Sequence, residues 1–503
     1  MTAPLLLSFA ALASAGECED RLEHGWRVDV PTWPGALASS AHGSLLAEPP
    51  TDGTPYRPEP IPEVDTYVAH EAVTALGASD WVAAGYDGRG VRVAVFDVQW
   101  YDAELRPNEL GAFETWDCQA HRSCEVPMDT LRPTFEYEEA SHGVACAETI
   151  RDVAPGVRLD LVRVNGLTTL ENAGAWAVEQ GVDVVSMSMS FYGNSFHDGT
   201  GPVNAVVDEM ASGDVLFVSS AGNSAREHWI ESFRDTDRDG FHEFEGGSEV
   251  LPVWFDAGSS RLQVLWDQFG RCGDTDLDAY VWSADGVLLG RTEERQTPGT
   301  SPCTPEESAR VWADAPGWTY VQVRRAAGDA WTRFALYARG GEMHQPIGAG
   351  AIADPGSNPL TFTVGAVWAA RYPGGAAESF SSQGPTHGGD PKPDIAGPDG
   401  LSTSIYGEAG FFGTSAATPA VAASVALVLS RYPEDTPAEA AARLQAWALS
   451  DDPTWSSWDG TVGAGYARLP PLETLEHGCG SRPLVLPVLF CFPFAASRRR
   501  MVT

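Results

Sequence analysis

Residues 91–97 read VRVAVFD, a short β-branched and apolar run that ends in a carboxylate, Asp97. Similar runs recur along the chain and alternate with stretches in which apolar residues have helical spacing. The further expected strands are 159–164, 182–187, 215–219 and 360–367, and the expected helices are 169–180, 203–211 and 415–432. This alternation predicts an α/β fold with a doubly wound parallel sheet, in which right-handed crossovers place helices on both faces.

The alternation stops between residues 234 and 345. Four short strand-like runs (261–266, 279–282, 319–323 and 333–338) are separated there by turn residues, without a convincing helix. This pattern is typical of an all-β sandwich or jelly roll. We therefore expect an inserted β domain at 234–345 that divides the α/β domain into residues 65–233 and 346–478.

Both ends of the chain resemble processed segments. Residues 1–15 form an apolar run that ends in small residues, as in a secretory signal peptide, although a buried first helix is the alternative. Residues 16–64, rich in Pro, Gly, Ala and Ser, read as a linker or short pro-segment. The tail at 479–503 contains an apolar run followed by three arginines. It resembles the sorting tails of some bacterial surface proteins, with a packed or disordered tail as the alternative.

Composition excludes several classes of partner. The 503 residues include 32 Lys and Arg against 69 Asp and Glu, a formal charge of −37. Such a surface repels phosphate backbones and anionic lipids, so we expect no nucleic-acid partner. Eight cysteines suit an oxidising compartment. The pairs Cys118–Cys124 and Cys272–Cys303 are candidate disulfides, although spacing does not fix the connectivity.

Three polar residues lie where such a sheet places reactive groups. Asp97 ends a strand, His142 opens a probable helix in SHGVACA, and Ser415 lies in GTSAATP at the start of the long apolar helix. Ligand sites of open α/β sheets lie at the carboxyl ends of the strands. An imidazole can accept the proton of a serine hydroxyl while a carboxylate fixes its tautomer, which is the logic of a hydrolytic triad. Asn223, in SSAGNSA just after another strand, is a candidate amide donor to an oxyanion.

At these motifs the chain resembles the subtilisin-like serine proteases, and the order Asp, His, Asn, Ser agrees with that family. The resemblance rests on VAVFD around Asp97, SHGVACAE around His142, SSAGNSA around Asn223 and GTSAATPAVA around Ser415, with weaker support at residues 183–190, 377–385 and 392–398.

The resemblance implies a secreted endopeptidase that acts on proteins or peptides. In it Asp97 orients the imidazole, His142 is the general base and acid, Ser415 is the nucleophile, and Asn223 is the oxyanion donor. The segment expected to pair with the substrate backbone is Ser188, Met189 and Ser190.

The sequence departs from the family pattern at two places. Val98 and Gln99 follow Asp97 where a small hydroxylated residue and glycine are usual, which questions the local support of the carboxylate. Ser190 stands where glycine is usual. We also expect Thr414 to be the N-cap of the long helix and Pro419 to lie in its first turn. Cys146, one helical turn after His142, is either a reactive thiol or a packed apolar side chain, and the second is favoured.

Acidic residues alternate in the inserted domain and predict structural calcium. Residues 235–240 (DTDRDG) resemble the first half of a calcium loop, with candidate ligands Asp235, Asp237, Asp239 and Glu243. Solvated acidic turns are the alternative reading. A weaker cluster, 274–278, lies in a segment that resembles the jelly-roll domains of bacterial secreted peptidases, whose implied role is accessory.

The sequence therefore favours a monomeric serine endopeptidase that is secreted or held at a bacterial cell surface through its tail. A catalytically inactive, calcium-dependent surface-binding protein on the same scaffold is the alternative. A related acid-acting fold that uses Glu and Asp with Ser is a further rival, and His142 and Asn223 argue against it.

Overall fold

The computed structural model of the chain describes residues 70–118, 124, 128, 141–269, 274–295, 304–328, 331–451 and 458–476. It also contains the short antiparallel pair β1 (Ala36–Leu37) and β2 (Leu46–Ala47). The expected signal at 1–15, the tail at 479–503 and the pair Cys272–Cys303 lie outside the described residues. The chain forms two compact units that divide between Leu469 and Pro470. The second contains α10 (Leu472–Glu476), and all other elements below belong to the first.

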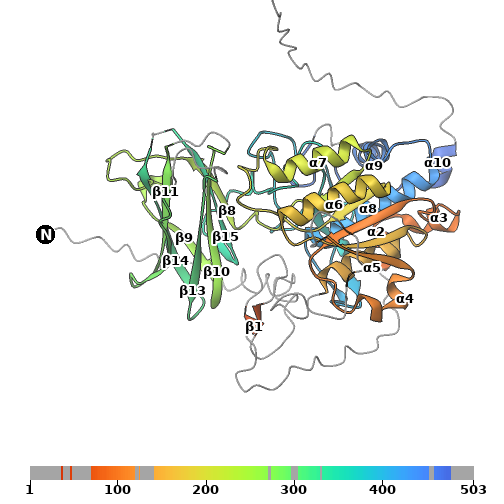
Figure 1. Cartoon of the computed structure of the whole chain (residues 1–503), viewed down its shortest axis with the longest axis horizontal. Helices are drawn as coiled ribbons and strands as arrows, with labels where there is room; N and C mark the ends of the chain where they lie inside the picture. Colours follow the sequence, from red (N-terminus) through yellow and green to blue (C-terminus); the bar gives the residue numbers. More distant parts are fainter. Residues whose placement is uncertain are drawn as a thin grey trace, which may run out of the picture. The chain divides into compact units, whose positions relative to one another are not determined.

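A seven-stranded sheet, parallel at every neighbouring pair, forms the centre of the α/β part of the first unit (Figure 1). Its order is β18 (Ile395–Asp399), β17 (Phe362–Trp368), β7 (Leu216–Ser220), β6 (Val184–Met187), β3 (Arg92–Asp97), β5 (Arg158–Arg163) and β4 (Phe113–Asp117). From β3 the chain runs first to β4 and β5 on one side and then crosses to β6 on the other side. This switch of direction opens a crevice at the carboxyl end of β3, the usual ligand position in such sheets. The predicted fold class is confirmed.

Helices cover both faces of this sheet. On one face α6 (Leu167–Gln180) and α7 (Pro202–Ser212) share an apolar cluster with Phe96, Met187 and Phe217. On the other face α8 (Thr414–Arg431) packs on β6, β7, β17 and β18, and α5 (His142–Val153) packs beside it on β3. Residues 414–429 of α8 are all buried, which explains why its sequence is apolar all round. The remaining helices are α2 (His70–Leu76), α3 (Ala78–Ala83), α4 (Pro107–Leu110) and α9 (Pro437–Asp451).

Two edge strands of the sheet were missed by the sequence interpretation. β4 is only half buried and carries Glu114 and Asp117, so it lacks the apolar run of an inner strand. β18 reads IAGPD, and its glycine and proline resemble a turn. The other strands of this parallel sheet are displaced by one or two residues from their expected bounds, and α6, α7 and α8 begin one or two residues earlier than expected.

Between β7 and β17 the chain forms two antiparallel sheets that enclose their own apolar cluster (Figure 1). The four-stranded sheet has the order β13 (Glu306–Ala313), β10 (Gly258–Trp266), β15 (Arg333–Arg339) and β8 (His228–Ser232). The five-stranded sheet has the order β12 (Leu288–Thr292), β11 (Asp276–Ser283), β14 (Gly317–Ala327), β9 (Leu251–Phe255) and β16 (Gly341–Met343). We call residues 228–343 the sandwich. The sandwich begins before the expected boundary at residue 234, since β8 pairs with β15 and is therefore its first strand.

A hairpin, β19 (Leu401–Thr403) and β20 (Gly407–Phe411), leads into α8. Within the described parts of the chain, no helix combines the length and the apolar character that a bilayer span requires.

Candidate active site

Asp97 is the last residue of β3 and its carboxylate is held on both oxygens. Oδ1 accepts the backbone N–H groups of Val98 (2.7 Å) and Gln99 (3.0 Å). Oδ2 lies 2.7 Å from Nδ1 of His142. The side chain is buried. Backbone amides therefore supply the local support that the residue types at 98 and 99 had put in question.

His142 is the first residue of α5, and a glycine lets this helix approach β3. A Cβ at Gly143 would lie 2.7 Å from Cβ of Asp97 and 2.9 Å from the carbonyl oxygen of Gln99, closer than real Cβ contacts. The Gly143 N–H donates to that same carbonyl. The bare backbone at 143 thus brings the imidazole to the carboxylate, and the hydrogen bond at Nδ1 leaves Nε2 as the nitrogen that can accept a proton.

Ser415 is the second residue of α8, and its hydroxyl donates a long hydrogen bond to the carbonyl oxygen of Ser188 (3.5 Å). The start of α8 rests against α5, because Cys146 directs its thiol to the carbonyl oxygen of Ser415 at 3.7 Å. Cys146 lies one turn after His142 on the same face of α5. Ser415 is therefore placed beside the helix that begins with the imidazole.

Asn223 follows β7 and is fixed through its side-chain oxygen. That oxygen accepts from the backbone N–H (3.0 Å) and the hydroxyl (2.9 Å) of Thr414. With Oδ1 occupied in this way, the NH₂ group lies at Gly413, where a Cβ would come within 3.0 Å of Nδ2. Gly413, at φ 102°, is the N-cap of α8. The amide donor and the N-terminus of the helix that carries Ser415 thus converge, which suits an oxyanion.

Two expectations about α8 are wrong. Thr414 is the first helical residue rather than the N-cap, because Gly413 takes that position and the Thr414 hydroxyl is used by Asn223. Pro419 lies inside the helix rather than in its first turn.

The sequence of this region matches the family model described as the subtilase family over residues 88–242 and 299–465. The chain belongs to the subtilase family. Its sequence is 28% identical over 220 residues to the minor extracellular protease Vpr of Bacillus subtilis (strain 168). This alignment covers 39% of the chain and 26% of Vpr, so the chain matches about a quarter of that relative's length. The chain also resembles the solved structure of the CspB protease of Clostridium perfringens, with a TM-score of 0.56 at 16% identity. The superposition covers 81% of this chain and 99% of the CspB chain. That likeness concerns the fold alone.

In this subtilase the segment expected to bind the substrate backbone comes directly after β6. The carbonyl oxygen of Ser188 accepts from Ser415, Met189 packs on the apolar cluster of the sheet, and Ser190 is half buried. The segment ends where Phe191 forms an isolated antiparallel bridge with Asp354. Pairing of residues 188–190 with a substrate remains a prediction.

A cavity of ≈ 360 Å³ adjoins this segment, and the sandwich supplies one of its walls. The α/β side contributes the residue after Asp97, the turn after β5 and the expected substrate segment: Val98, Val164, Asn165, Gly166, Met189, Ser190, Phe191 and Tyr192. The sandwich contributes Arg261, Gln263, Glu306 and Arg339. The two sides touch closely, since a Cβ at Gly193 would overlap the Glu306 carboxylate. The sequence offered no signal for this wall, because its residues come from three separate strands.

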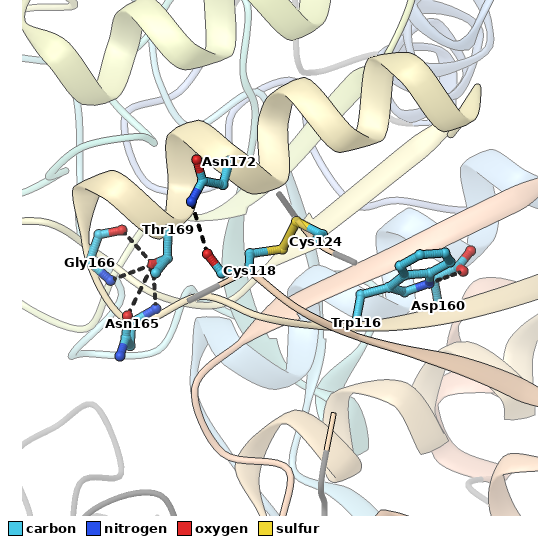
Figure 2. The surroundings of a disulfide bond; sticks show 8 residues. All are labelled: Trp116, Cys118, Cys124, Asp160, Asn165, Gly166, Thr169 and Asn172. Atoms are coloured by element: carbon cyan, nitrogen blue, oxygen red, sulfur yellow. Dashed lines mark hydrogen bonds between the residues drawn. A yellow bond between two sulfur atoms is a disulfide. The ribbon is translucent and has the colours of Figure 1, made fainter. Parts of the chain in front are cut away.

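Figure 2 shows how the turn at the edge of this cavity is held. The Thr169 hydroxyl accepts the backbone N–H groups of Asn165 (2.8 Å) and Gly166 (3.0 Å) at the start of α6. On the next turn Asn172 donates to the carbonyl oxygen of Cys118 (3.0 Å), which forms a disulfide with Cys124. The structure thus contains the candidate disulfide Cys118–Cys124.

Cys146 is a buried free cysteine. Burial, and next the charge of Asp97, raise the pKa of its thiol well above the ordinary value. A thiol that stays protonated is a poor nucleophile, so Cys146 is a packing residue.

The expected calcium loop is only partly assembled. Carboxylate oxygens of Asp235, Asp237 and Asp239 lie within 4.8 Å of one another. Glu243 is absent from this group and instead accepts from the backbone N–H and the hydroxyl of Thr236. These hydrogen bonds lower the pKa of Glu243.

A second carboxylate group is buried in the sandwich. Oxygens of Asp276 and Asp278 on β11 and of Glu307 on β13 lie within 4.8 Å of one another. Burial raises the pKa of Glu307 to about 8. The sequence had pointed to Asp276 and Asp278, whereas Asp274 lies outside the group. Glu307 could not be found because it comes from the opposite sheet.

Proposed function

We propose that this subtilase is an exported serine endopeptidase that hydrolyses peptide bonds through Asp97, His142 and Ser415. The observation that carries the proposal is the 2.7 Å contact between Asp97 and His142 beside the N-terminus of α8. Family membership supports the same chemistry. Export is supported by the apolar N-terminal run and by the similarity to a protease named as extracellular.

Each group would have one task in this mechanism. Asp97 holds the His142 tautomer and stabilises the imidazolium that forms when Nε2 takes the Ser415 proton. The Ser415 oxygen then attacks the scissile carbonyl, and its negative charge develops between the Asn223 amide and the start of α8. His142 then returns the proton to the leaving amine as the C–N bond breaks, which leaves the acyl group as an ester on Ser415. Water activated by His142 attacks this ester, and its cleavage releases the carboxylic acid and restores the Ser415 hydroxyl.

Labelling and proteolysis separate this proposal from the inactive binding protein. The calcium-loaded full chain should hydrolyse casein and react with a fluorophosphonate probe, and Ser415→Ala should abolish both. Ser424→Ala is the matched control, since Ser424 is a buried serine on the same helix that donates only to the Ala420 carbonyl. Folded protein that does not react with the probe would favour the binding protein. Optimal activity below about pH 5 would favour the acid-acting rival, because a histidine base must be neutral.

We further propose that the sandwich binds structural calcium, with Asp276, Asp278 and Glu307 as its main ligands. All three side chains are buried. Glu307 Oε1 has no hydrogen-bond partner among the described residues, and the guanidinium of Arg324 is 3.7 Å from Asp278. Three buried carboxylates close together repel one another, and a hard divalent cation with oxygen ligands relieves that repulsion. The exposed group Asp235, Asp237 and Asp239 is proposed as a weaker second position.

Thermal unfolding of Ser415→Ala protein, which cannot digest itself, tests the calcium proposal. Added Ca²⁺ should raise Tm, and Glu307→Gln should remove most of that rise. Asp237→Asn, in the exposed loop, should remove only a small part. An equal calcium response in wild type and Glu307→Gln would place the ion elsewhere.

A further inference from the structure

Three buried histidines meet where the first sandwich strand leaves the α/β fold. His228 is the first residue of β8, His387 lies in the connection between β17 and β18, and His197 lies in the connection between β6 and α7. All three are buried, and none belongs to the catalytic group. The rings of His197 and His228 both lie close to that of His387, with centroids 5.8 and 5.3 Å away and planes inclined by 26° and 28°.

The ring nitrogens of His228 and His387 have an unusual arrangement. Nδ1 of His228 lies 2.6 Å from the carbonyl oxygen of Ile347, and Nδ1 of His387 lies 2.6 Å from that of Phe196. A carbonyl only accepts, so each Nδ1 carries the hydrogen. In a neutral imidazole Nε2 then presents a lone pair. The two Nε2 atoms are 3.2 Å apart, so two lone pairs face each other.

Two lone pairs that face each other repel, and a cation between the two nitrogens would remove that repulsion. A bridging proton would make one ring an imidazolium in a place that excludes water.

A transition metal ion fits the same arrangement. Histidines that bind metals characteristically donate their other N–H to a backbone carbonyl or a carboxylate, as both of these do. Two nitrogens about 2.05 Å from a tetrahedral Zn²⁺ are about 3.3 Å apart, close to the separation observed here. His197 Nδ1 pairs with the Tyr337 hydroxyl (2.9 Å), and its Nε2 has no partner among the described residues. His197 does not complete a three-ligand group, because its ring nitrogens and the two Nε2 atoms do not all lie within 4.8 Å of one another.

We propose that His228 and His387 bind a divalent transition metal of the Zn²⁺, Cu²⁺ or Ni²⁺ class. Neutral imidazoles suit these borderline metals and are poor ligands for calcium, so this site is distinct from the carboxylate groups. The ion would join the first strand of the sandwich to the α/β fold, five residues beyond Asn223. It would act as a structural clip between the two parts.

Metal titration of the full chain tests this proposal. The background is Ser415→Ala with Cys146→Ala, because Asp97, His142 and Cys146 also place ligand atoms within 4.8 Å of one another. After treatment with a chelator, the protein should take up one equivalent of Zn²⁺ at micromolar or lower concentration, measured against a chromophoric chelator. Saturating Ca²⁺ should leave this uptake unchanged. Co²⁺ should give the visible absorption of a site with nitrogen ligands.

Two ligand variants and one matched control complete the test. His228→Gln and His387→Gln should each weaken Zn²⁺ binding at least about 100-fold, since ligand loss costs more than the 10–100-fold of an outer-shell change. His242→Gln removes another buried histidine of the sandwich and should bind Zn²⁺ as before. Absence of tight uptake by the parent protein would overturn the proposal and leave a proton as the bridge. Uptake that both ligand variants retain would overturn it as well. The Co²⁺ spectrum of the parent protein decides the question even if a variant fails to fold.

Discussion

The Ser188 hydroxyl donates a 3.0 Å hydrogen bond to the carbonyl oxygen of Ser415. In a regular helix that oxygen would accept the N–H of the residue four positions later. That residue is Pro419, which has no N–H. The proline therefore frees the carbonyl of Ser415 for a donor from the expected substrate segment, and the hydroxyl of Ser415 donates in turn to the Ser188 carbonyl.

Ser188→Ala should destabilise the fold by about 1 kcal/mol, because a buried carbonyl loses its main donor. Pro419→Ala restores the helical N–H, so the same serine change should cost clearly less in that background. Urea unfolding of Ser415→Ala protein measures both costs, and the double-mutant cycle isolates the coupling. Equal costs in the two backgrounds would show that Pro419 does not control this contact.

Gly143→Ala should disrupt the catalytic pair without removing any functional group. The added methyl would meet Asp97 and Gln99, so α5 must move away from β3. A misplacement of about 1 Å can cost about 100-fold in rate, and we expect kcat/KM to fall by at least that much. Gly317→Ala, at a position with open space around it, should leave kcat/KM unchanged. Full activity of Gly143→Ala would mean that the close approach is not needed.

Asn223→Ala should lower kcat by about 10²–10³-fold with little change in KM, because the amide acts on charge that develops only in the transition state. Asn223→Asp keeps the oxygen that accepts from Thr414 but removes the NH₂ group. We expect kcat of Asn223→Asp to fall to a similar degree. This result would separate the role of the Asn223 NH₂ group as a donor from the role of its oxygen in holding Thr414. A KM effect alone would assign Asn223 to substrate binding.

The residues of the candidate site could be selected from the sequence because each carries a local signal. Asp97 ends an apolar strand, His142 and Ser415 begin helices, and parallel strands bring such positions to one edge. The support of Asp97 could not be predicted, since backbone N–H groups provide it whatever the side chains at 98 and 99 are. The residue type of Thr414 predicts an N-cap, but Gly413, at φ 102°, takes that position.

Contacts between distant strands left no such signal. Arg261, Glu306 and Arg339 line the cavity from three strands of the sandwich, and their spacing along the chain carries no pattern. The histidine pair joins residues 159 positions apart. Alternation of side chains predicts which residues of a strand share a face, but it does not predict which strand lies opposite.

The stability of the sandwich should fall with rising pH when calcium is absent. The ordinary pKa of a glutamate is 4.5, and burial raises the pKa of Glu307 to about 8 in the folded protein. Between these values the folded state holds a proton that the unfolded state has released, so the free energy of unfolding decreases as pH rises through this window. Glu148, whose pKa burial raises to about 7, adds a decrease of the same sign at lower pH.

Glu307→Gln should therefore flatten the pH dependence of Tm across the window between pH 4.5 and about 8, most clearly in its middle. Tm of Ser415→Ala protein in chelator, recorded with and without Glu307→Gln, measures this difference. Calcium should reverse the trend in the parent protein, because the ion takes the place of the proton and binds more tightly as the carboxyl group ionises. A parent and a variant with parallel Tm curves in chelator would show that Glu307 ionises normally and that the buried carboxylate group needs no cation.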